Sequence, residues 1–246
     1  MTSPWPETVV RRTATALEPL RDPAEAIAMA TYMKFVAPFL GVRSTPRRLA
    51  LREHWRGLET PTSDALGEAC VALMAKEQRE YHYAAYDLIE RYVDVTDEYF
   101  LVEYVEKLLT TKPWWDTVDG FGSTAVSPLC RRYDAGELVL NWSASDNRWL
   151  NRAAIQHQRG WKDDTDVGFV LRLCDAHSAN REFFVAKAIG WALRDIARLD
   201  APAVRTFVRR HPNLSSVAVR EARRGLGELS TKPTNSSKRV ISNLRP

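Results

Sequence analysis

The feature that most constrains the fold of this chain is an apolar period of three and four residues that recurs along almost its whole length. Four instances are Leu66, Cys70 and Leu73; Tyr81, Ala85, Leu88 and Tyr92; Leu101, Val105 and Leu108; and Phe184, Ala188 and Trp191. Side chains with this spacing lie on one face of an α-helix and can be buried together. The sequence contains no sustained alternation typical of strands. The pattern therefore predicts an all-α protein.

Prolines indicate where several of these helices begin. The pairs Asp22-Pro23, Thr45-Pro46 and Thr60-Pro61 each place a capping side chain before a proline that suits the first helical position. Roughly a dozen short helical segments favour antiparallel pairs, stacked so that each buries its neighbour's apolar face. We expect a helical solenoid, and this expectation rests on the pattern of helices because no residue-level repeat is visible.

Composition allows one large domain followed by a tail. The chain has 246 residues, of which 45% are hydrophobic, and this is enough for a sizeable core. We expect residues 1–225 to form a single helical domain. After Gly225 the sequence is poor in apolar residues and rich in turn formers, so residues 226–246 are predicted to be a mobile, polar, basic tail. Such tails offer loose phosphate contacts but more often have no specific role.

Several familiar kinds of site are missing from the sequence. The three cysteines are too far apart for a C-x-x-C metal pair and are expected to be core residues. No P-loop, H-E-x-x-H or G-x-S-x-G motif occurs, and Gly120-Phe-Gly122 is a lone G-x-G after a helical segment. The five histidines are dispersed, which favours structural roles. We therefore expect no metal and no cofactor.

Nothing in the sequence indicates a membrane. The N-terminus lacks a basic segment followed by an apolar stretch, and no apolar run approaches membrane-spanning length. We expect an intracellular, cytoplasmic protein with no membrane partner.

The net charge of +4 conceals an uneven distribution. Five arginines face one glutamate in residues 43–56, and six face one glutamate in residues 203–224, whereas residues 80–119 carry ten acidic and three basic side chains. A polyanion is attracted by a local positive field and does not require a high overall charge. The distribution fits a basic binding surface with an acidic outer wall. Solvated helix faces would explain it about equally well.

The segment Lys112-Pro-Trp-Trp-Asp-Thr-Val-Asp119 carries the strongest chemical signal. Pro113 is expected in the first turn of a helix, with Thr111 or Lys112 as the cap. Trp115 and Asp119 are then four residues apart on one helix face, where an indole and a carboxylate line a small surface that suits a cation. Core packing is the alternative interpretation.

Two later segments carry further candidates. Ser145-Asp-Asn begins with capping residues, and Arg148, Arg152 and Gln156 follow at helical spacing on one polar face suited to a phosphate. An ion pair between Arg152 and an acidic neighbour is the alternative, with about equal weight. Trp191, in residues 182–194, could reach a ligand, but a core position is favoured on sequence alone.

Taken together, three segments closely resemble the AlkD-like DNA alkylation repair proteins: residues 114–119, 144–154 and 183–194. Residues 32–41, followed by Thr45-Pro-Arg-Arg48, resemble the N-terminal signature of that family. The resemblance spans roughly residues 25 to 225 in order. It implies a HEAT-like, ARM-type solenoid that cradles duplex DNA in a concave basic face. It also implies a monofunctional DNA glycosylase that removes purines alkylated at N3 or N7, such as 3-methyladenine and 7-methylguanine.

The resemblance also implies roles for particular residues. An N3- or N7-alkylated purine is already cationic and leaves as a neutral base, so one carboxylate suffices where ordinary glycosidases need two. Asp119 would stabilise positive charge on the deoxyribose and position the attacking water, and Trp115 and Trp191 would flank the sugar. Arg152 would hold a backbone phosphate, and Tyr32 would line the same groove. Further DNA contacts are expected from Arg148, Lys187, Arg47 and Arg48.

The family's lesion need not enter a base-sized pocket, so an open groove on a solenoid is sufficient. The partner is then double-stranded DNA containing alkylated purines, bound by a monomer that is associated with the nucleoid when on DNA. The main alternative is a non-catalytic HEAT-like scaffold that binds damaged or branched DNA, or another protein. A purely structural scaffold would bury Trp115, Trp191 and Asp119 and satisfy them among themselves.

Overall fold

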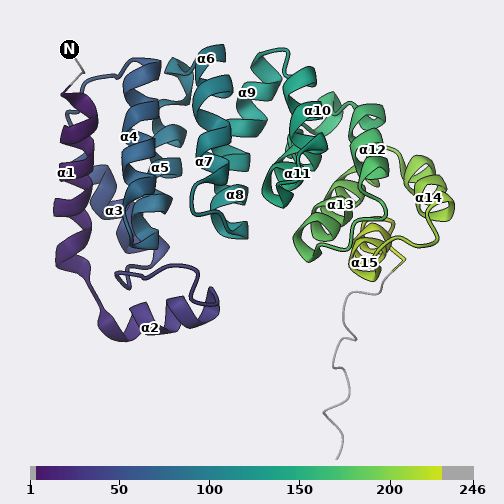
Figure 1. Cartoon of the computed structure of the whole chain (residues 1–246), viewed down its shortest axis with the longest axis horizontal. Coiled ribbons are helices and arrows are strands. Elements are labelled where there is room, and N and C mark those ends of the chain that lie inside the picture. The colour runs from purple at the N-terminus through teal and green to yellow at the C-terminus, as the bar shows by residue number, and fades with distance from the viewer. Residues whose placement is uncertain (1–3, 229–246) are drawn as a thin grey trace, which may run out of the picture.

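The computed structural model describes residues 4–228, and all regular structure within them is helical (Figure 1). The α-helices are α1 (Trp5–Leu17), α2 (Pro23–Tyr32), α3 (Ser44–His54), α4 (Ser63–Ala75), α5 (Arg79–Tyr92), α6 (Glu98–Phe100), α7 (Glu106–Thr110), α8 (Trp115–Phe121), α9 (Ser127–Arg132), α10 (Gly136–Ala144), α11 (Arg148–Ile155), α12 (Val167–Ala176), α13 (Phe183–Ile196), α14 (Ala201–Arg210) and α15 (Ser216–Gly225). The prediction of an all-α chain is confirmed.

Two of these helices are continued by π-helical turns. Leu101–Val105 joins α6 to α7, and Gly122–Val126 joins α8 to α9. Single π-helical turns inside helical rods are uncommon and are found frequently at functional sites. The second one directly follows the segment in which the sequence places its candidate carboxylate.

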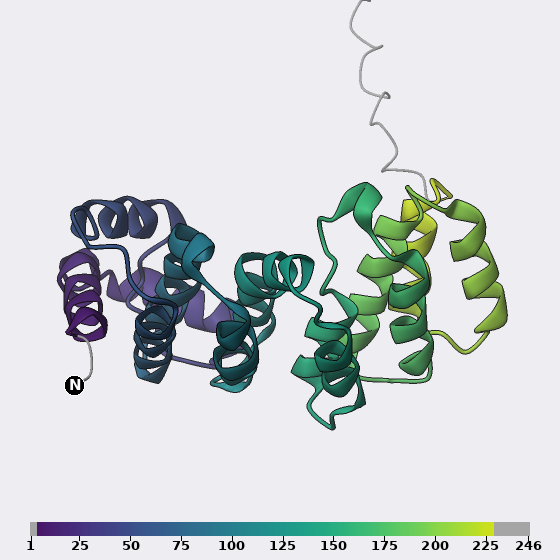
Figure 2. The same cartoon turned by 90° about the horizontal axis from the view of Figure 1, so that it is seen from above.

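The helices stand side by side in a row of antiparallel pairs, which is the expected solenoid arrangement. Figure 1 shows the row from α1 to α15, and Figure 2 shows it from above. Helix α4 packs against α5, α10 against α11, and α13 against α15. Helix α2 departs from this pattern, because it lies across one end of the row and has no buried residue.

One apolar core runs the length of the row. It extends from Val9 in α1 to Ala222 in α15 and includes Cys70, Cys130 and Cys174, all buried as expected. Apolar faces at three- and four-residue spacing from successive helices meet in this core, which is how a solenoid stabilises helices that are individually short. A second small cluster, of Met33, Phe39 and Tyr83, lies beside α2.

The expected helix starts are correct in one case and displaced in the others. Asp22 caps α2 as predicted, and its carboxylate accepts from the backbone N–H groups of Ala24 and Glu25. Helix α3 begins at Ser44, so Pro46 lies third in it, and α4 is capped by Thr62 and not by Thr60. The capping and proline signals locate a helix start to within a few residues, while the packing of the helix determines its first residue.

Contacts continue a few residues past residue 225. Within the predicted tail, Leu226 caps α15 and Glu228 pairs with Arg205 of α14 at 3.4 Å. The rest of the predicted tail, residues 229–246, lies outside the described residues. Among residues 4–228, no helix combines the length and apolar character that a bilayer crossing demands.

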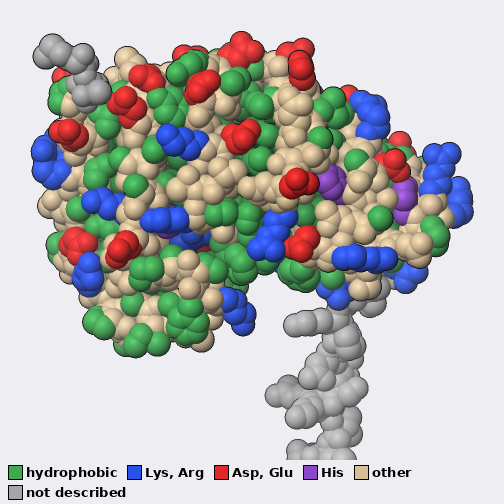
Figure 3. All heavy atoms as spheres, in the orientation of Figure 1, with side chains coloured by type: hydrophobic (Ala, Val, Ile, Leu, Met, Phe, Trp, Pro, Cys, Tyr) green, Lys and Arg blue, Asp and Glu red, His purple; other side chains and the backbone are tan. Residues whose placement is uncertain are grey.

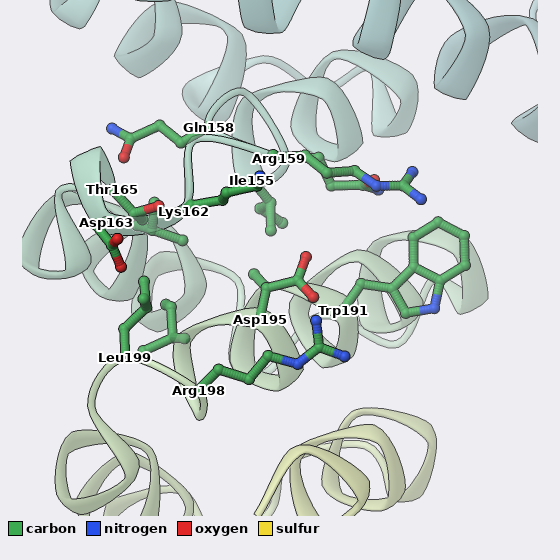
Figure 4. Close-up of a pocket in the computed structure, with 15 residues that line it drawn as sticks. Ile155, Gln158, Arg159, Lys162, Asp163, Thr165, Trp191, Asp195, Arg198 and Leu199 are labelled. Atoms are coloured by element: carbon green, nitrogen blue, oxygen red, sulfur yellow. The ribbon is translucent and has the colours of Figure 1, made fainter.

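Charge is distributed unevenly over the face shown in Figure 3. Acidic side chains gather along the upper edge of that view, and Lys and Arg side chains lie mainly in its lower half and at the C-terminal end. The lower edge is hollowed between α2 and α13, with basic side chains on both sides of the hollow. A concave edge with this sign of charge attracts a polyanion.

Candidate functional site

The candidate site is built around α8, whose first turn is fixed by a buried arginine of α5. Arg79 is fully buried and donates to both carboxylate oxygens of Asp116, at 3.1 Å from Nε and 2.6 Å from Nη2. Tyr83 donates its hydroxyl to the same carboxylate at 2.5 Å. Arg79 also donates to the Lys112 carbonyl and the Thr117 hydroxyl. These bonds clamp the start of α8 against α5.

This clamp moves the helix start from its predicted position. Helix α8 begins at Trp115 with Trp114 as its cap, whereas the sequence favoured Pro113 in the first turn. The Thr117 hydroxyl bonds both the N–H and the carbonyl of Trp114, at 3.3 and 3.2 Å. Lys112 adopts a left-handed φ of 44°, which ends any helical path before Pro113. The spacing of Trp115 and Asp119 within one helix is unaffected.

Asp119 pairs with Arg152 of α11 in a two-pronged ion pair. Arg152 Nε and Nη2 each donate to an Asp119 oxygen at 2.8 Å, and Nη1 donates to the Phe184 carbonyl at 2.7 Å. The Arg152 side chain is 1% exposed and that of Asp119 is 16% exposed. Planar bidentate pairs of this kind fix geometry as well as charge. Asp119 is thereby held in one orientation.

Of the two alternatives for α11, the structure has the ion pair of Arg152 with an acidic residue and not the open polar face. Arg152 and Gln156 are buried, because α11 packs against both α8 and α13. Only Arg148 is exposed, and it pairs with Glu182 at 3.0 Å. Contact between Arg152 and a phosphate stays a prediction, one that requires Arg152 to leave at least one present partner.

The two adjacent tryptophans have different surroundings. Trp114 packs against Trp149 and Phe184, with ring centroids 5.7 and 5.0 Å apart, and so anchors the start of α8. Trp115 is partly buried and packs against both apolar clusters. It shares a helix face with Asp119, four residues on.

Trp191, on α13, is surrounded by cationic side chains. Its ring centre lies 5.0 Å from the Arg152 guanidinium carbon, 4.8 Å from that of Arg159, 5.2 Å from Lys187 Nζ and 5.9 Å from the Arg194 guanidinium carbon. The indole is partly buried and not a core residue. Cations already lie against its ring, so these surroundings favour an anion, such as a phosphate, over a further cation.

Asp119 opens onto a shallow cleft between α8 and α11. The cleft has a volume of about 10 Å³ and is lined by Val118, Asp119, Gly122, Arg152, Ala153, Gln156 and Arg159. This space is too small for a base, since a single water needs about as much. A cavity of about 430 Å³ lies beside it, bordered by Trp191, and shares Gln156 and Arg159 with the cleft.

The remaining predicted DNA contacts fall into exposed and buried groups. Tyr32 is 72% exposed at the end of α2, Lys187 is partly exposed, and Arg48 is exposed although it pairs with Asp87 at 3.1 Å. Arg47 is buried, pairs with the same Asp87 at 3.2 Å and lies over the Tyr83 ring. The expectation that Arg47 contacts DNA is wrong, because helix α3 turns that face toward α5 and away from solvent.

Two residues of the site were missed by sequence reasoning. Arg159 is exposed, borders both the cleft and the cavity, and forms no ion pair within residues 4–228. It lies in the irregular segment after α11, where no periodicity marks it. Arg79 could not be found either, because nothing local links it to Asp116, 37 residues later.

The buried histidines are structural. Burial lowers the pKa of His82 and of His157 to about 4, so both are neutral at ordinary pH. His82 accepts from Arg79 at Nδ1 and donates to the Lys76 carbonyl at Nε2. No cluster of three or more metal-binding side chains occurs within residues 4–228.

Comparison with known proteins agrees with this fold. A family model described as DNA alkylation repair enzyme matches residues 13–226. The chain belongs to the DNA alkylation repair enzyme family. A solved structure, described as a predicted DNA alkylation repair enzyme from Enterococcus faecalis, superposes with a TM-score of 0.76 at 26% sequence identity, covering 85% of this chain and 98% of that one. No curated protein matches the chain.

The region matched to the DNA alkylation repair enzymes contains α5, α8, α11, α13 and the segment after α11, and these carry the candidate site. Membership supports a role in the repair of alkylated DNA, with DNA as the substrate. It leaves the reaction and the lesion to be argued from the side chains of the site.

Proposed function

We propose that this DNA alkylation repair enzyme is a monofunctional DNA glycosylase that hydrolyses the N-glycosidic bond of cationic N3- or N7-alkylated purines in duplex DNA. The observation that carries the proposal is the Asp119 carboxylate, fixed by Arg152 at the edge of a cleft. A preorganised carboxylate at a partly dry surface stabilises positive charge far better than one in water.

The chemistry needs only one such carboxylate. The bonding electrons of the glycosidic bond move onto the purine, which loses its positive charge and leaves as a neutral base. Positive charge then develops on the deoxyribose, next to Asp119. Water adds to the sugar carbon and its proton passes to Asp119 or to solvent, leaving an abasic site. No acid has to protonate the leaving base.

The two tryptophans have different roles in this proposal. Trp115 shares a helix face with Asp119 and offers its ring to the cationic sugar. Trp191 packs along the same nucleotide, while the cations around it, Arg159 and Lys187 above all, bind the neighbouring phosphates. These cations around Trp191 bind the DNA backbone, and the Asp119 carboxylate beside them keeps its negative charge.

The lesion reaches this site without entering a pocket. The cleft at Asp119 holds about 10 Å³, so neither base nor sugar enters it, and the sugar approaches the carboxylate from the open side of the cleft. An open approach of this kind suits a concave solenoid edge, on which DNA lies along several helices. We propose that the protein acts as a monomer in the cytoplasm, on nucleoid DNA.

The direct test is incubation of the purified protein with N-methylated duplex DNA over a range of salt concentrations. We expect free 3-methyladenine or 7-methylguanine and an equal yield of abasic sites, with Asp119→Asn as the inactive control. DNA binding without base release at any salt concentration would instead favour a non-catalytic scaffold. The ion pair of both Asp119 oxygens with Arg152 is the observation that favours this second candidate.

A further inference from the structure

Helix α2 and the turn after it carry the most exposed large apolar side chains of residues 4–228. Tyr32 is 72% exposed, Phe35 71% and Ile27 67%, and Val36 is exposed beside them. Exposed apolar side chains are ordinary when they are scattered singly, whereas a cluster of them marks a surface that a partner covers. Helix α2 buries none of its own residues in return. The packing of the solenoid therefore does not explain this cluster.

The backbone of the turn is strained at Phe35. Lys34 and Phe35 have φ angles of 60° and 56°, in the left-handed region that glycine tolerates and an aromatic residue rarely adopts. The Phe35 N–H donates to the Ala30 carbonyl at 2.7 Å and closes the turn. Strain of this kind persists only where the surrounding structure fixes it, and it is concentrated at sites that contact ligands. Phe35 is thus an exposed aromatic ring on a tightly bonded turn.

Buried residues close to Phe35 connect the turn to the candidate site. Met33 and Phe39 are buried in one small cluster, against which Trp115 packs. Further along, the buried Glu80 carboxylate accepts from three successive backbone N–H groups, those of residues 40–42, at 2.8 to 3.0 Å. The turn is therefore held on both sides, and a single layer of buried side chains links it to the helix face of Trp115.

The turn lies at the edge of the basic hollow between α2 and α13. Figure 1 shows α2 running from the lower end of α1 toward the middle of the molecule, so its C-terminal end borders the hollow. Figure 3 shows a basic side chain at this end. Lys34 is exposed and forms no ion pair within residues 4–228. A free cation beside exposed rings favours a nucleic acid as the partner, because phosphates pair with the cation while bases contact the rings.

The proposed reaction includes one step that no residue of the cleft performs. The cleft at Asp119 holds about 10 Å³, so no pocket draws the alkylated nucleotide out of the base stack. In a paired duplex, the stacked neighbours hold that nucleotide in place. Its displacement toward Asp119 must therefore be driven by a residue outside the cleft.

We propose that Phe35 is a positioning residue that wedges into the duplex beside the lesion, with Tyr32 against the adjacent sugar and Lys34 on a phosphate. An apolar side chain inserted between base pairs unstacks one step and kinks the duplex. The kink moves the sugar of the alkylated nucleotide toward the open side of the Asp119 cleft. The inference rests on the proposed function and adds to it how the lesion reaches the carboxylate.

The fluorescence of 2-aminopurine, a base analogue that brightens when it is unstacked, tests the wedge without catalysis. The probe is a duplex with 2-aminopurine beside a 7-methylguanine whose 2′-fluorinated sugar resists hydrolysis. At saturating protein, we expect wild type to raise the fluorescence severalfold and Phe35→Ala to abolish the rise. Phe35→Leu keeps an apolar wedge and should restore most of it. Tyr99→Ala is the matched control, because Tyr99 is an exposed aromatic residue on α6, at the opposite, acidic edge, and it should leave the rise unchanged.

Single-turnover release of 7-methylguanine separates positioning from a loss of folding. We expect Phe35→Ala to slow release from fully paired DNA on the order of tenfold, because the inserted ring no longer offsets the unstacking of a base step. The loss should shrink to about twofold when mismatched pairs flank the lesion, since these are already partly unstacked. Phe35→Gly should release the base as slowly as Phe35→Ala but melt at a higher temperature, because glycine adopts a φ of 56° without strain.

Three results overturn the wedge. One is an equal rise in fluorescence with wild type and Phe35→Ala, and another is the same loss of release from paired and mismatched DNA. The third is a wild-type dimer in sedimentation that Phe35→Ala dissociates, which would assign the apolar cluster to a second copy of the chain.

Failure of the proposed function gives a different pattern. A fluorescence rise that depends on Phe35, with no base release by wild type, refutes only the glycosylase. Normal base release with no fluorescence rise refutes only the wedge.

Discussion

Helix α8 carries two aspartates three residues apart, and each is gripped by an arginine from another helix, yet the two pairs differ in what surrounds them. Asp116 receives three hydrogen bonds, two from Arg79 and one from Tyr83, and that arginine is also bonded to Lys112 and Thr117. Asp119 receives two bonds, both from Arg152, and borders a cleft.

The difference separates a structural carboxylate from one that can act on a ligand. A carboxylate has about four acceptor positions, so Asp116 is close to saturated, whereas Asp119 keeps free positions on the side of the cleft. Both arginines are about 1% exposed, so both pairs fix α8 in place. In the proposed function, the segment Trp-Trp-Asp-Thr-Val-Asp thus contains both residues that hold the helix and residues that act on the substrate.

The largest effect should come from Asp119→Asn. We expect the rate of 7-methylguanine release to fall on the order of 100-fold to 1,000-fold, because a preorganised charge worth about 3 to 4 kcal/mol is lost. Single-turnover release from methylated duplex DNA measures this. A rate within threefold of wild type, roughly 0.7 kcal/mol, would remove Asp119 from the mechanism.

A double variant controls for folding. Asp119→Asn leaves the buried Arg152 without its counter-charge, which destabilises the fold. Asp119→Asn combined with Arg152→Gln removes both charges and should recover part of the lost thermal stability. Base release should stay low in the double variant. Recovery of release together with stability would mean that Asp119 acts only as a structural partner.

Asp116→Asn should show the opposite balance. We expect the free energy of unfolding to fall by about 3 kcal/mol, because Arg79 is fully buried and loses its counter-charge. Base release per folded molecule should fall far less than in Asp119→Asn. Urea unfolding and active-site-normalised rates test both statements. If Asp116→Asn is as inactive as Asp119→Asn while folded, the two carboxylates are not divided in this way.

Much of the site could be predicted from local spacing in the sequence. What could not be predicted depends on partners that are distant along the chain. The placement of Trp115 and Asp119 on one helix follows from a four-residue interval, and the all-α solenoid follows from apolar periodicity. The partners of the arginines do not follow. The sequence leaves an ion pair at Arg152 as one of two alternatives and places Arg47 among the DNA contacts, whereas both are buried in ion pairs. Their partners lie 33 and 40 residues away along the chain.

The residues that sequence reasoning could not find share a cause. Arg159 and the cavity beside it exist only because an irregular segment folds back over α13. No apolar period, cap or motif describes such a segment, so its side chains carry no local signal. The helix faces were therefore predictable, and the places where helices meet were not.

The next effect is a dependence of stability on pH that involves the Arg79–Asp116 pair and not the Arg152–Asp119 pair, because His82 is hydrogen-bonded to Arg79. Burial lowers the pKa of His82 to about 4 in the folded protein, against 6.5 as the ordinary value. The neutral His82 therefore stabilises the folded state fully above pH 6.5. This contribution is lost as the pH falls toward 4, because the imidazole takes up a proton in the unfolded chain before it does so in the folded protein. We expect His82 to contribute a loss of about 3 kcal/mol in the free energy of unfolding, since one pKa unit corresponds to about 1.4 kcal/mol. Denaturant unfolding at both ends of that pH range measures it.

His82→Gln supplies the comparison for this measurement. The variant should be less dependent on pH than wild type over the same range, while His157, whose pKa is also lowered to about 4, retains its own contribution. Identical pH profiles for wild type and His82→Gln would show that the Asp116 network does not hold a neutral histidine.

The smallest effect should come from Arg159→Ala, which touches only the Asp119 side of the comparison. Arg159 is exposed, lies 4.8 Å from the Trp191 ring centre and has no ion pair within residues 4–228, so its charge is available for a phosphate. We expect DNA affinity to fall a few fold and the slope of log affinity against log salt to drop by about 1, without dependence on sequence or lesion. Arg205→Ala is the matched control, because Arg205 lies on α14 and pairs with Glu228; it should leave the affinity and the salt slope unchanged.

Equal slopes for Arg159→Ala and wild type would mean that Arg159 does not contact a phosphate. The contact would then belong to Lys187 or to Arg152, and in the case of Arg152 its pair with Asp119 would have to open when DNA binds.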